Sequence, residues 1–106
     1  MLTDNNKIEK MKILAIEKVT EGIIAEQFKP HLKNEALKIW EYYKNGIVRE
    51  IYFTKNDHTA VIMLECKDES EAELCLSELP MVKEGLIGFT ILPLVAYEGF
   101  ERLFEK

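Results

Sequence analysis

The order of strand-like and helix-like segments constrains the fold of this chain more than any other feature of its sequence. Four short runs are rich in β-branched and aromatic residues and are bounded by turn residues, a pattern typical of β-strands. They span residues 12–19, 47–55, 59–66 and 86–95. After the first run, apolar residues recur at spacings of three and four, which predicts an amphipathic helix that ends at Asn45 and Gly46. Ser70 and Glu73 have the spacing of a capping box, which predicts the start of a second helix.

The predicted order is therefore β-α-β-β-α-β, which defines an α+β fold of the ferredoxin-like type. In this fold a four-stranded antiparallel sheet carries both helices on one face. Right-handed crossovers place the first and third strands in the middle of the sheet. Pro93 lies in the last run and cannot donate a ladder hydrogen bond, so it is expected on an edge strand or at the end of a strand.

The 106-residue length fits one domain. Residues 1–10 are polar and lack periodicity, so we interpret them as a flexible leader, and residues 11–106 as a single domain. The tail that follows the last strand contains Tyr97, Phe100, Leu103 and Phe104, which is too apolar to be left in water. We expect this tail to dock on the domain or on a partner.

Charge and composition exclude several classes of partner. Nineteen acidic residues against fourteen basic ones give a net charge of −5, which argues against nucleic acid and against anionic membrane surfaces. No apolar run is long enough to cross a bilayer, and the polar start does not resemble a signal peptide. Cys66 and Cys75 lack metal-ligand spacing and read as small apolar residues of a reducing compartment. A cytoplasmic protein is therefore expected.

Alternation along the strands predicts two apolar faces of the sheet, because successive strand residues point in opposite directions. One set is expected to face the helices: Leu14, Ile16, Ile51, Phe53, Ile62, Leu64, Leu92 and Leu94. The other set includes Ile13, Ala15, Tyr52 and Met63 and is too apolar to face water. A second copy of the chain is the expected cover, since two sheets packed face to face would close a barrel with the helices outside. The alternative is a monomer whose C-terminal tail folds across this face.

The periodic stripe of the first helix predicts which of its residues enter the core. The stripe consists of Phe28, Leu32, Ala36, Ile39, Trp40 and Tyr43. These side chains are expected to be buried against the sheet. Tyr42 lies off the stripe and is expected to point away from the core.

Several segments together resemble a known family. They are K-I-L-A-I-E-K near the start, E-A-L-K-I-W-E-Y-Y-K-N-G-I-V-R-E-I-Y-F, L-P-M-V-K-E-G-L-I and the closing G-F-E-R-L-F. The pattern is similar to the small muconolactone-isomerase-like proteins of the dimeric α/β-barrel superfamily, over nearly all of Met11 to Phe104. The resemblance implies a homodimer or higher homo-oligomer with a small-molecule pocket by the sheet. The superfamily also contains cofactor-free monooxygenases, haem-dependent enzymes and members with no known reaction, and no catalytic residue is carried over from it.

Three acidic residues within the strands are the candidate catalytic groups: Glu17, Glu50 and Glu65. A carboxyl group among apolar neighbours must pair, become neutral or serve a site. A carboxyl with a raised pKa is what an isomerase needs to move a proton beside a carbonyl. Glu17 is the first choice, because the first strand is central and its end opens toward the pocket. The alternative is that these residues form ion pairs with Arg49 or with nearby lysines.

Arg49, Tyr52 and His31 are the candidate substrate-binding residues. The planar guanidinium of Arg49 suits a carboxylate substrate, and equally suits an ion pair with Glu17 or Glu65. Tyr52 could donate a hydrogen bond into a pocket or simply pack. His31 lies at the start of the first helix, and neither it nor His58 has a neighbour at metal-ligand spacing, so no metal and no cofactor are expected.

These features predict a small-molecule-binding dimer and indicate a cofactor-free isomerase that shifts a proton on a small carboxylate or lactone. Two alternatives remain open: a non-catalytic ligand-binding or structural dimer, and a cofactor-free monooxygenase. The sequence has no Gly-rich phosphate loop, no G-x-S-x-G motif and no Cys/His pair. Phosphoryl transfer and covalent hydrolysis are therefore not expected.

Overall fold

A computed structural model describes residues 9–105, so most of the predicted leader lies outside the described residues. The strands are β1 (Met11–Val19), β2 (Val48–Phe53), β3 (Ala60–Cys66) and β4 (Ile87–Leu94). The helices are α1 (Leu32–Lys44), α2 (Glu69–Ser77) and α3 (Pro80–Lys83). Residues 9–105 also include three 3₁₀ helices: η2 (Ala25–Gln27), η3 (Lys29–His31) and η4 (Gly99–Phe104). Across residues 9–105, every helix is too short or too polar to cross a membrane.

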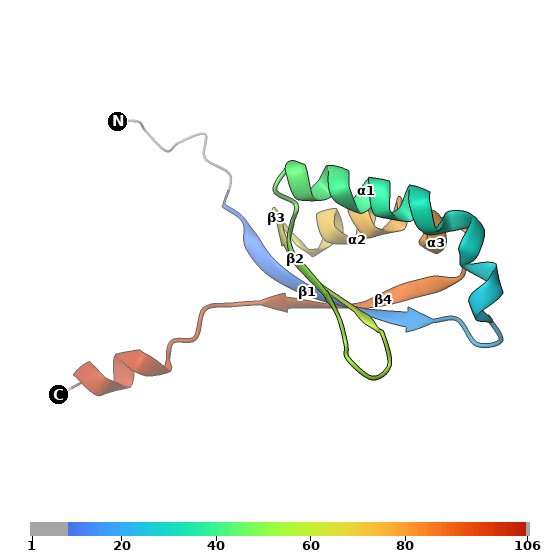
Figure 1. The fold of residues 1–106 in the computed structure, drawn as a ribbon. Coiled ribbons are helices and arrows are strands. Elements are labelled where there is room, and N and C mark those ends of the chain that lie inside the picture. Colours follow the sequence, from blue (N-terminus) through green and yellow to red (C-terminus); the bar gives the residue numbers. More distant parts are fainter. Residues whose placement is uncertain (1–8, 106) are drawn as a thin grey trace.

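The four strands form one antiparallel sheet in the order β2-β3-β1-β4. This order confirms the predicted ferredoxin-like α+β fold, with the first and third strands in the middle. The helices α1, α2 and α3 lie on one side of the sheet and leave the other side open (Figure 1). Pro93 lies on β4, an edge strand, where a missing N–H leaves no gap inside the sheet.

The register of the strands shows which residues share a face. Ile13 pairs with Leu64 and Ala15 with Ile62, and all four are almost completely buried. Residues directly opposite each other in an antiparallel pair point to the same face, so this set lies beneath the helices. The residues between them form the open face, which we define as Leu14, Ile16, Tyr52, Val61, Met63, Thr90, Leu92 and Leu94.

The predicted faces are correct for β2 and β3 and wrong for β1 and β4. Ile13 and Ala15 lie in the core, whereas Leu14 and Ile16 lie on the open face. Both faces of β1 are apolar, so alternation groups its residues correctly but cannot say which group faces the helices. A shift of one residue reverses the assignment of every side chain in a strand.

The end of α1 follows the predicted signal. Asn45 caps the helix, and Gly46 adopts a φ of +83°, in the left-handed region that glycine enters without a steric penalty. The N–H of Ile47 donates to the carbonyl of Tyr42 at 2.9 Å, and the N–H of Gly46 donates to that of Tyr43 at 3.2 Å. These two bonds form a Schellman motif, which turns the chain from α1 into β2.

The N-cap of α2 lies two residues before the predicted one. The N-cap is Asp68, whose side chain accepts a hydrogen bond from the N–H of Glu71 at 2.9 Å. Glu71 in turn accepts from the N–H of Lys67 at 2.7 Å. Ser70 and Glu73 have the right spacing, but Asp68 precedes them and is an equally good capping residue.

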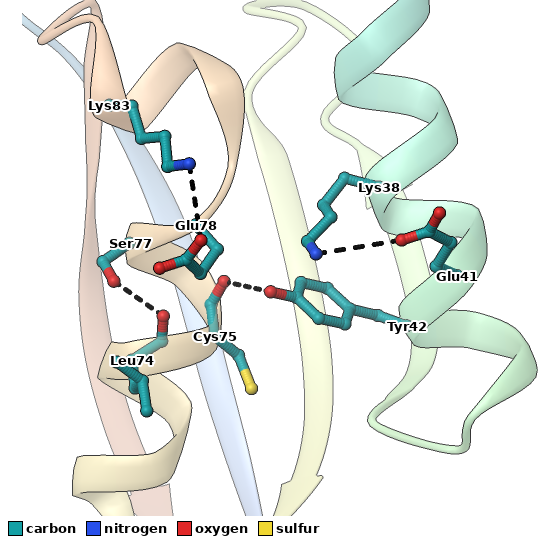
Figure 2. Close-up of polar contacts among 8 residues, drawn as sticks. All are labelled: Lys38, Glu41, Tyr42, Leu74, Cys75, Ser77, Glu78 and Lys83. Carbon is teal, nitrogen blue, oxygen red and sulfur yellow. Dashed lines mark hydrogen bonds and ion pairs between the residues drawn. The ribbon is translucent and has the colours of Figure 1, made fainter.

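Tyr42 is buried, contrary to its prediction. Its hydroxyl donates a 2.6 Å hydrogen bond to the carbonyl oxygen of Cys75, which joins α1 to α2 (Figure 2). Burial, with smaller contributions from Cys75 and Glu78, raises the pKa of Tyr42 to about 12. The phenol is therefore a permanent hydrogen-bond donor at the contact between the two helices.

Replacing Tyr42 with Phe is expected to destabilise the chain by about 1 kcal/mol, because the ring still packs while the Cys75 carbonyl loses its donor. Urea unfolding would measure the change. Tyr97→Phe is the matched control, because Tyr97 is 70% exposed and should change stability little. Equal stability of Tyr42→Phe and the wild type would contradict the role assigned to this bond.

The C-terminal segment leaves the domain after β4. The short helix η4 lies well beyond the end of the sheet (Figure 1). The segment exposes most of the surface of Val95, Tyr97, Phe100, Leu103 and Phe104. It does not fold back across the open face of its own sheet, as the monomer alternative requires.

Candidate ligand-binding cavity

A cavity of about 560 Å³ lies between α1 and the helix-covered face of the sheet. Its size is in the range of small-molecule sites, which are usually apolar with a few polar groups. Its apolar walls come from α1, from the strands and from α3. These residues are Leu32, Ala36, Ile39, Trp40, Tyr43, Ile51, Phe53, Ala60, Ile62, Met81, Ile87 and Phe89.

The apolar stripe of α1 forms one wall of this cavity. Five of the six residues predicted to be core line the cavity, and only Phe28 does not. Leu32, Trp40 and Tyr43 are 56%, 52% and 53% exposed, so the prediction that they are buried is wrong. The periodicity identified the face of α1 that turns toward the sheet, but α1 does not close onto the sheet along its whole length. An open apolar space remains between them.

Glu17 reaches the cavity from β1. Its Oε1 accepts a hydrogen bond from the N–H of Ala60 at 2.8 Å. The paired residues of β1 and β3 end at Ile16 and Val61, so this N–H lies just beyond the ladder and takes a side chain as its partner. The bond fixes the carboxylate near the end of the central strand. Glu17 shares the face of Ile13 and Ala15, so it lies on the helix-covered side of the sheet and not on the opposite side that the sequence predicted for these residues.

Glu35 reaches the cavity from α1 and is only 8% exposed. Its Oε1 accepts a 2.9 Å hydrogen bond from the N–H of Met81, one of the N–H groups at the start of α3 that have no partner within the helix. Burial raises the pKa of Glu35, and the charge of Glu17 raises it further. The Met81 N–H and the charge of His31 oppose this rise without cancelling it.

Each carboxyl group keeps one oxygen free for a ligand. In the described part of the chain, neither Glu17 Oε2 nor Glu35 Oε2 has a hydrogen-bond partner. No side-chain nitrogen or oxygen in the described chain is both fully buried and unpartnered, so each free oxygen keeps some accessible surface. The residues that line the cavity include no lysine and no arginine within 9–105. The cavity therefore combines apolar walls with two acidic groups.

The other predicted acids lie apart from the cavity. Lys12 donates a 2.8 Å hydrogen bond to Glu65, and this bond, with a smaller effect of Arg49, lowers the pKa of Glu65. Tyr52 donates to Glu50 at 3.0 Å, which raises the pKa of the Tyr52 hydroxyl. These contacts use residues whose register places them on the open side of the sheet. The structure does not bring Glu50 or Glu65 together with Glu17.

Arg49 lies at the edge of the sheet. Its Nε is 3.7 Å from Glu65 Oε1, and it lines a separate hollow of about 350 Å³ with Trp40, Tyr43, Lys44 and Val48. Arg49 therefore forms the ion pair with Glu65 that was one of its two interpretations. Arg49 does not line the cavity that contains Glu17.

The two histidines have different surroundings. His31 precedes α1 and does not line the cavity, although its charge acts on Glu35. His58 adopts a positive φ of 55° in the hairpin turn, and its ring stacks on Phe53 with the centroids 3.9 Å apart. Across residues 9–105, no three His, Cys, Asp or Glu side chains form a cluster that could hold a metal ion.

Glu35 is the site residue that the sequence reasoning missed. A charged residue in an amphipathic helix is usually solvated, so its residue type alone does not indicate a site. The available signal was its position four residues before Ile39 and seven before Tyr42, which places all three on one side of α1. In the structure that side carries the buried Tyr42, and Glu35 on the same side is buried where it meets the start of α3.

Comparisons with protein-family models and with curated proteins find no match to this chain.

Proposed function

We propose that this chain is a small-molecule-binding protein whose ligand occupies the cavity between α1 and the sheet. The observation that carries the proposal is the combination of an open apolar space of about 560 Å³ with two anchored carboxyl groups. A helix stripe that served only the core would be closed against the sheet. Here Trp40 and Tyr43 keep about half of their surface exposed beside Glu17 and Glu35.

We further propose that the protein is a homodimer formed through the open face of the sheet. Leu14, Ile16, Met63 and Leu92 place apolar groups side by side on adjacent strands, and α1, α2 and α3 all cover the opposite face. A contiguous apolar face of this kind marks an interface. The resemblance to muconolactone-isomerase-like proteins supports the same assembly, with each cavity lying outside the interface between the sheets.

A cofactor-free isomerase is the second candidate, favoured by the raised pKa of Glu35 beside Glu17. Neutral Glu35 would donate a proton to a carbonyl oxygen while Glu17 removes a proton from the adjacent carbon; the proton would then return at a different carbon. A lactone suits this pair of acids better than a free carboxylate, because Arg49 is not at the cavity. Glu35→Gln would then keep ligand binding and lower turnover by about 10²- to 10⁴-fold.

Filling the cavity tests the proposal. The neutral dye N-phenyl-1-naphthylamine is expected to bind the wild type with increased fluorescence. Ala36→Trp places an indole in the cavity and should weaken binding at least about tenfold. Leu37→Trp is the matched control, since Leu37 is an exposed neighbour on α1 that does not line the cavity. Equal binding by both variants, or no binding by the wild type, would reject the cavity as the ligand site.

A further inference from the structure

We propose that the ligand of this cavity is an organic cation, with an apolar body and one ammonium group held by Glu17 and Glu35. This inference rests on the proposed function and adds the chemical class of the ligand. Three observations support it: the acidic groups on the cavity wall, their free carboxyl oxygens, and the aromatic rings that line the same cavity.

The charged groups on the wall have one sign. Glu17 and Glu35 come from different elements, β1 and α1, and both line the cavity, whereas the described lining includes no lysine and no arginine. Two basic residues of the neighbouring structure lie outside this lining: His31 precedes α1, and Lys44 lines the neighbouring hollow. An anionic ligand would find no cationic side chain on this described lining to balance its charge, and ionised carboxylates would repel it more strongly than in water.

The free oxygens of the two carboxyl groups are poor partners for each other and good partners for a donor. Each Oε1 is occupied by a backbone N–H, at 2.8 Å for Glu17 and 2.9 Å for Glu35. These bonds fix both groups, so their free oxygens are held in place for a ligand. An ammonium group donates up to three hydrogen bonds and carries the charge opposite to a carboxylate, and so it suits a site with two such acceptors.

Aromatic rings on the same wall favour a cation further. The rings of Trp40 and Tyr43 stack with their centroids 5.7 Å apart, and both residues line the cavity with Phe53 and Phe89. Faces of aromatic rings attract cations, especially where water is excluded. The Trp40 ring already has a cation near it, since Lys44 Nζ lies 5.9 Å from its centroid.

Three ligands of matched shape test the inference: 2-naphthylmethylamine, 2-naphthalenemethanol and 2-naphthoate, titrated calorimetrically into the full chain at pH 7. The amine is expected to bind at least about tenfold more tightly than the alcohol, and the carboxylate not at all. If the alcohol or the carboxylate binds as tightly as the amine, the ligand class is wrong although the cavity still binds small molecules. If none of the three binds, and the neutral dye does not bind either, the proposed function fails as well.

Variants of Glu17 and Glu35 separate the contribution of charge to amine binding from the contribution of the shape of the cavity. Glu17→Gln and Glu35→Gln both keep an oxygen for the backbone N–H, and each should weaken amine binding about tenfold while changing alcohol binding less than about twofold. Glu41→Gln is the matched control, an exposed acid on α1 that does not line the cavity, and it should bind the amine like the wild type. Equal loss of amine and alcohol binding in the two cavity variants would overturn the inference.

Discussion

Leu14→Asp is expected to dissociate the proposed dimer and leave the fold intact, whereas Ile13→Asp is expected to unfold the chain. The two residues are adjacent on β1 and point to opposite faces. Ile13 is completely buried among Leu64 and other core residues, so an aspartate there would place an unpaired charge in the core. Such a substitution is expected to lower the free energy of unfolding by about 4 kcal/mol or more. Leu14 lies on the open face, where the charge is buried only when a second sheet covers it.

Sedimentation at micromolar concentration and circular dichroism would measure these two outcomes. Leu14→Asp should sediment as a folded monomer, and Ile13→Asp should lose its cooperative unfolding transition. Asn34→Asp, on an exposed position of α1, is the control and should remain a folded dimer. A wild-type chain that sediments as a monomer would reject the dimer. Unfolding by Leu14→Asp together with tolerance of Ile13→Asp would contradict the register of β1.

The fold could be predicted from the sequence because its elements are local and its topology is restrictive. The strand runs, the helix stripe and the signal at Asn45 and Gly46 each depend on a few neighbouring residues, and the order of the elements then leaves few arrangements. The face of β1 could not be predicted. Both of its sides are apolar, and only the pairing with β3 and the position of the helices distinguish Ile13 from Leu14.

The candidate site was predictable in part. Glu17 could be predicted because a carboxyl group among the apolar residues of a strand must pair, become neutral or serve a site. Glu35 could not, since its burial depends on α3, which comes 45 residues later in the chain and provides the N–H of Met81. The cavity itself has no local signal, because Trp40 and Tyr43 follow the same spacing whether a helix closes onto the sheet or stands away from it. How closely an amphipathic helix approaches the sheet depends on all the side chains that lie between them.

The stability of the folded chain is expected to depend on pH through the carboxyl group of Glu35. The ordinary pKa of this carboxyl is 4.5, and burial raises it in the folded chain, with Glu17 adding to the effect and His31 opposing it. The folded state therefore binds this proton more tightly than the unfolded state does. The stability from this proton is fully present below pH 4.5 and is lost as the pH rises through the raised pKa.

Glu35→Gln isolates this contribution, because the amide oxygen can still accept the hydrogen bond of Met81 N–H but cannot ionise. The pKa of Glu65 is lowered, so Glu65 changes the pH dependence of stability in the opposite direction. The informative quantity is therefore the difference in the free energy of unfolding between Glu35→Gln and the wild type at each pH. Urea unfolding from pH 4 to pH 8 should show Glu35→Gln gaining stability relative to the wild type as the pH rises, with the smallest gain at pH 4. A difference for Glu35→Gln that is constant across the range would mean that Glu35 contributes only its hydrogen bond, and that no proton is held in the cavity.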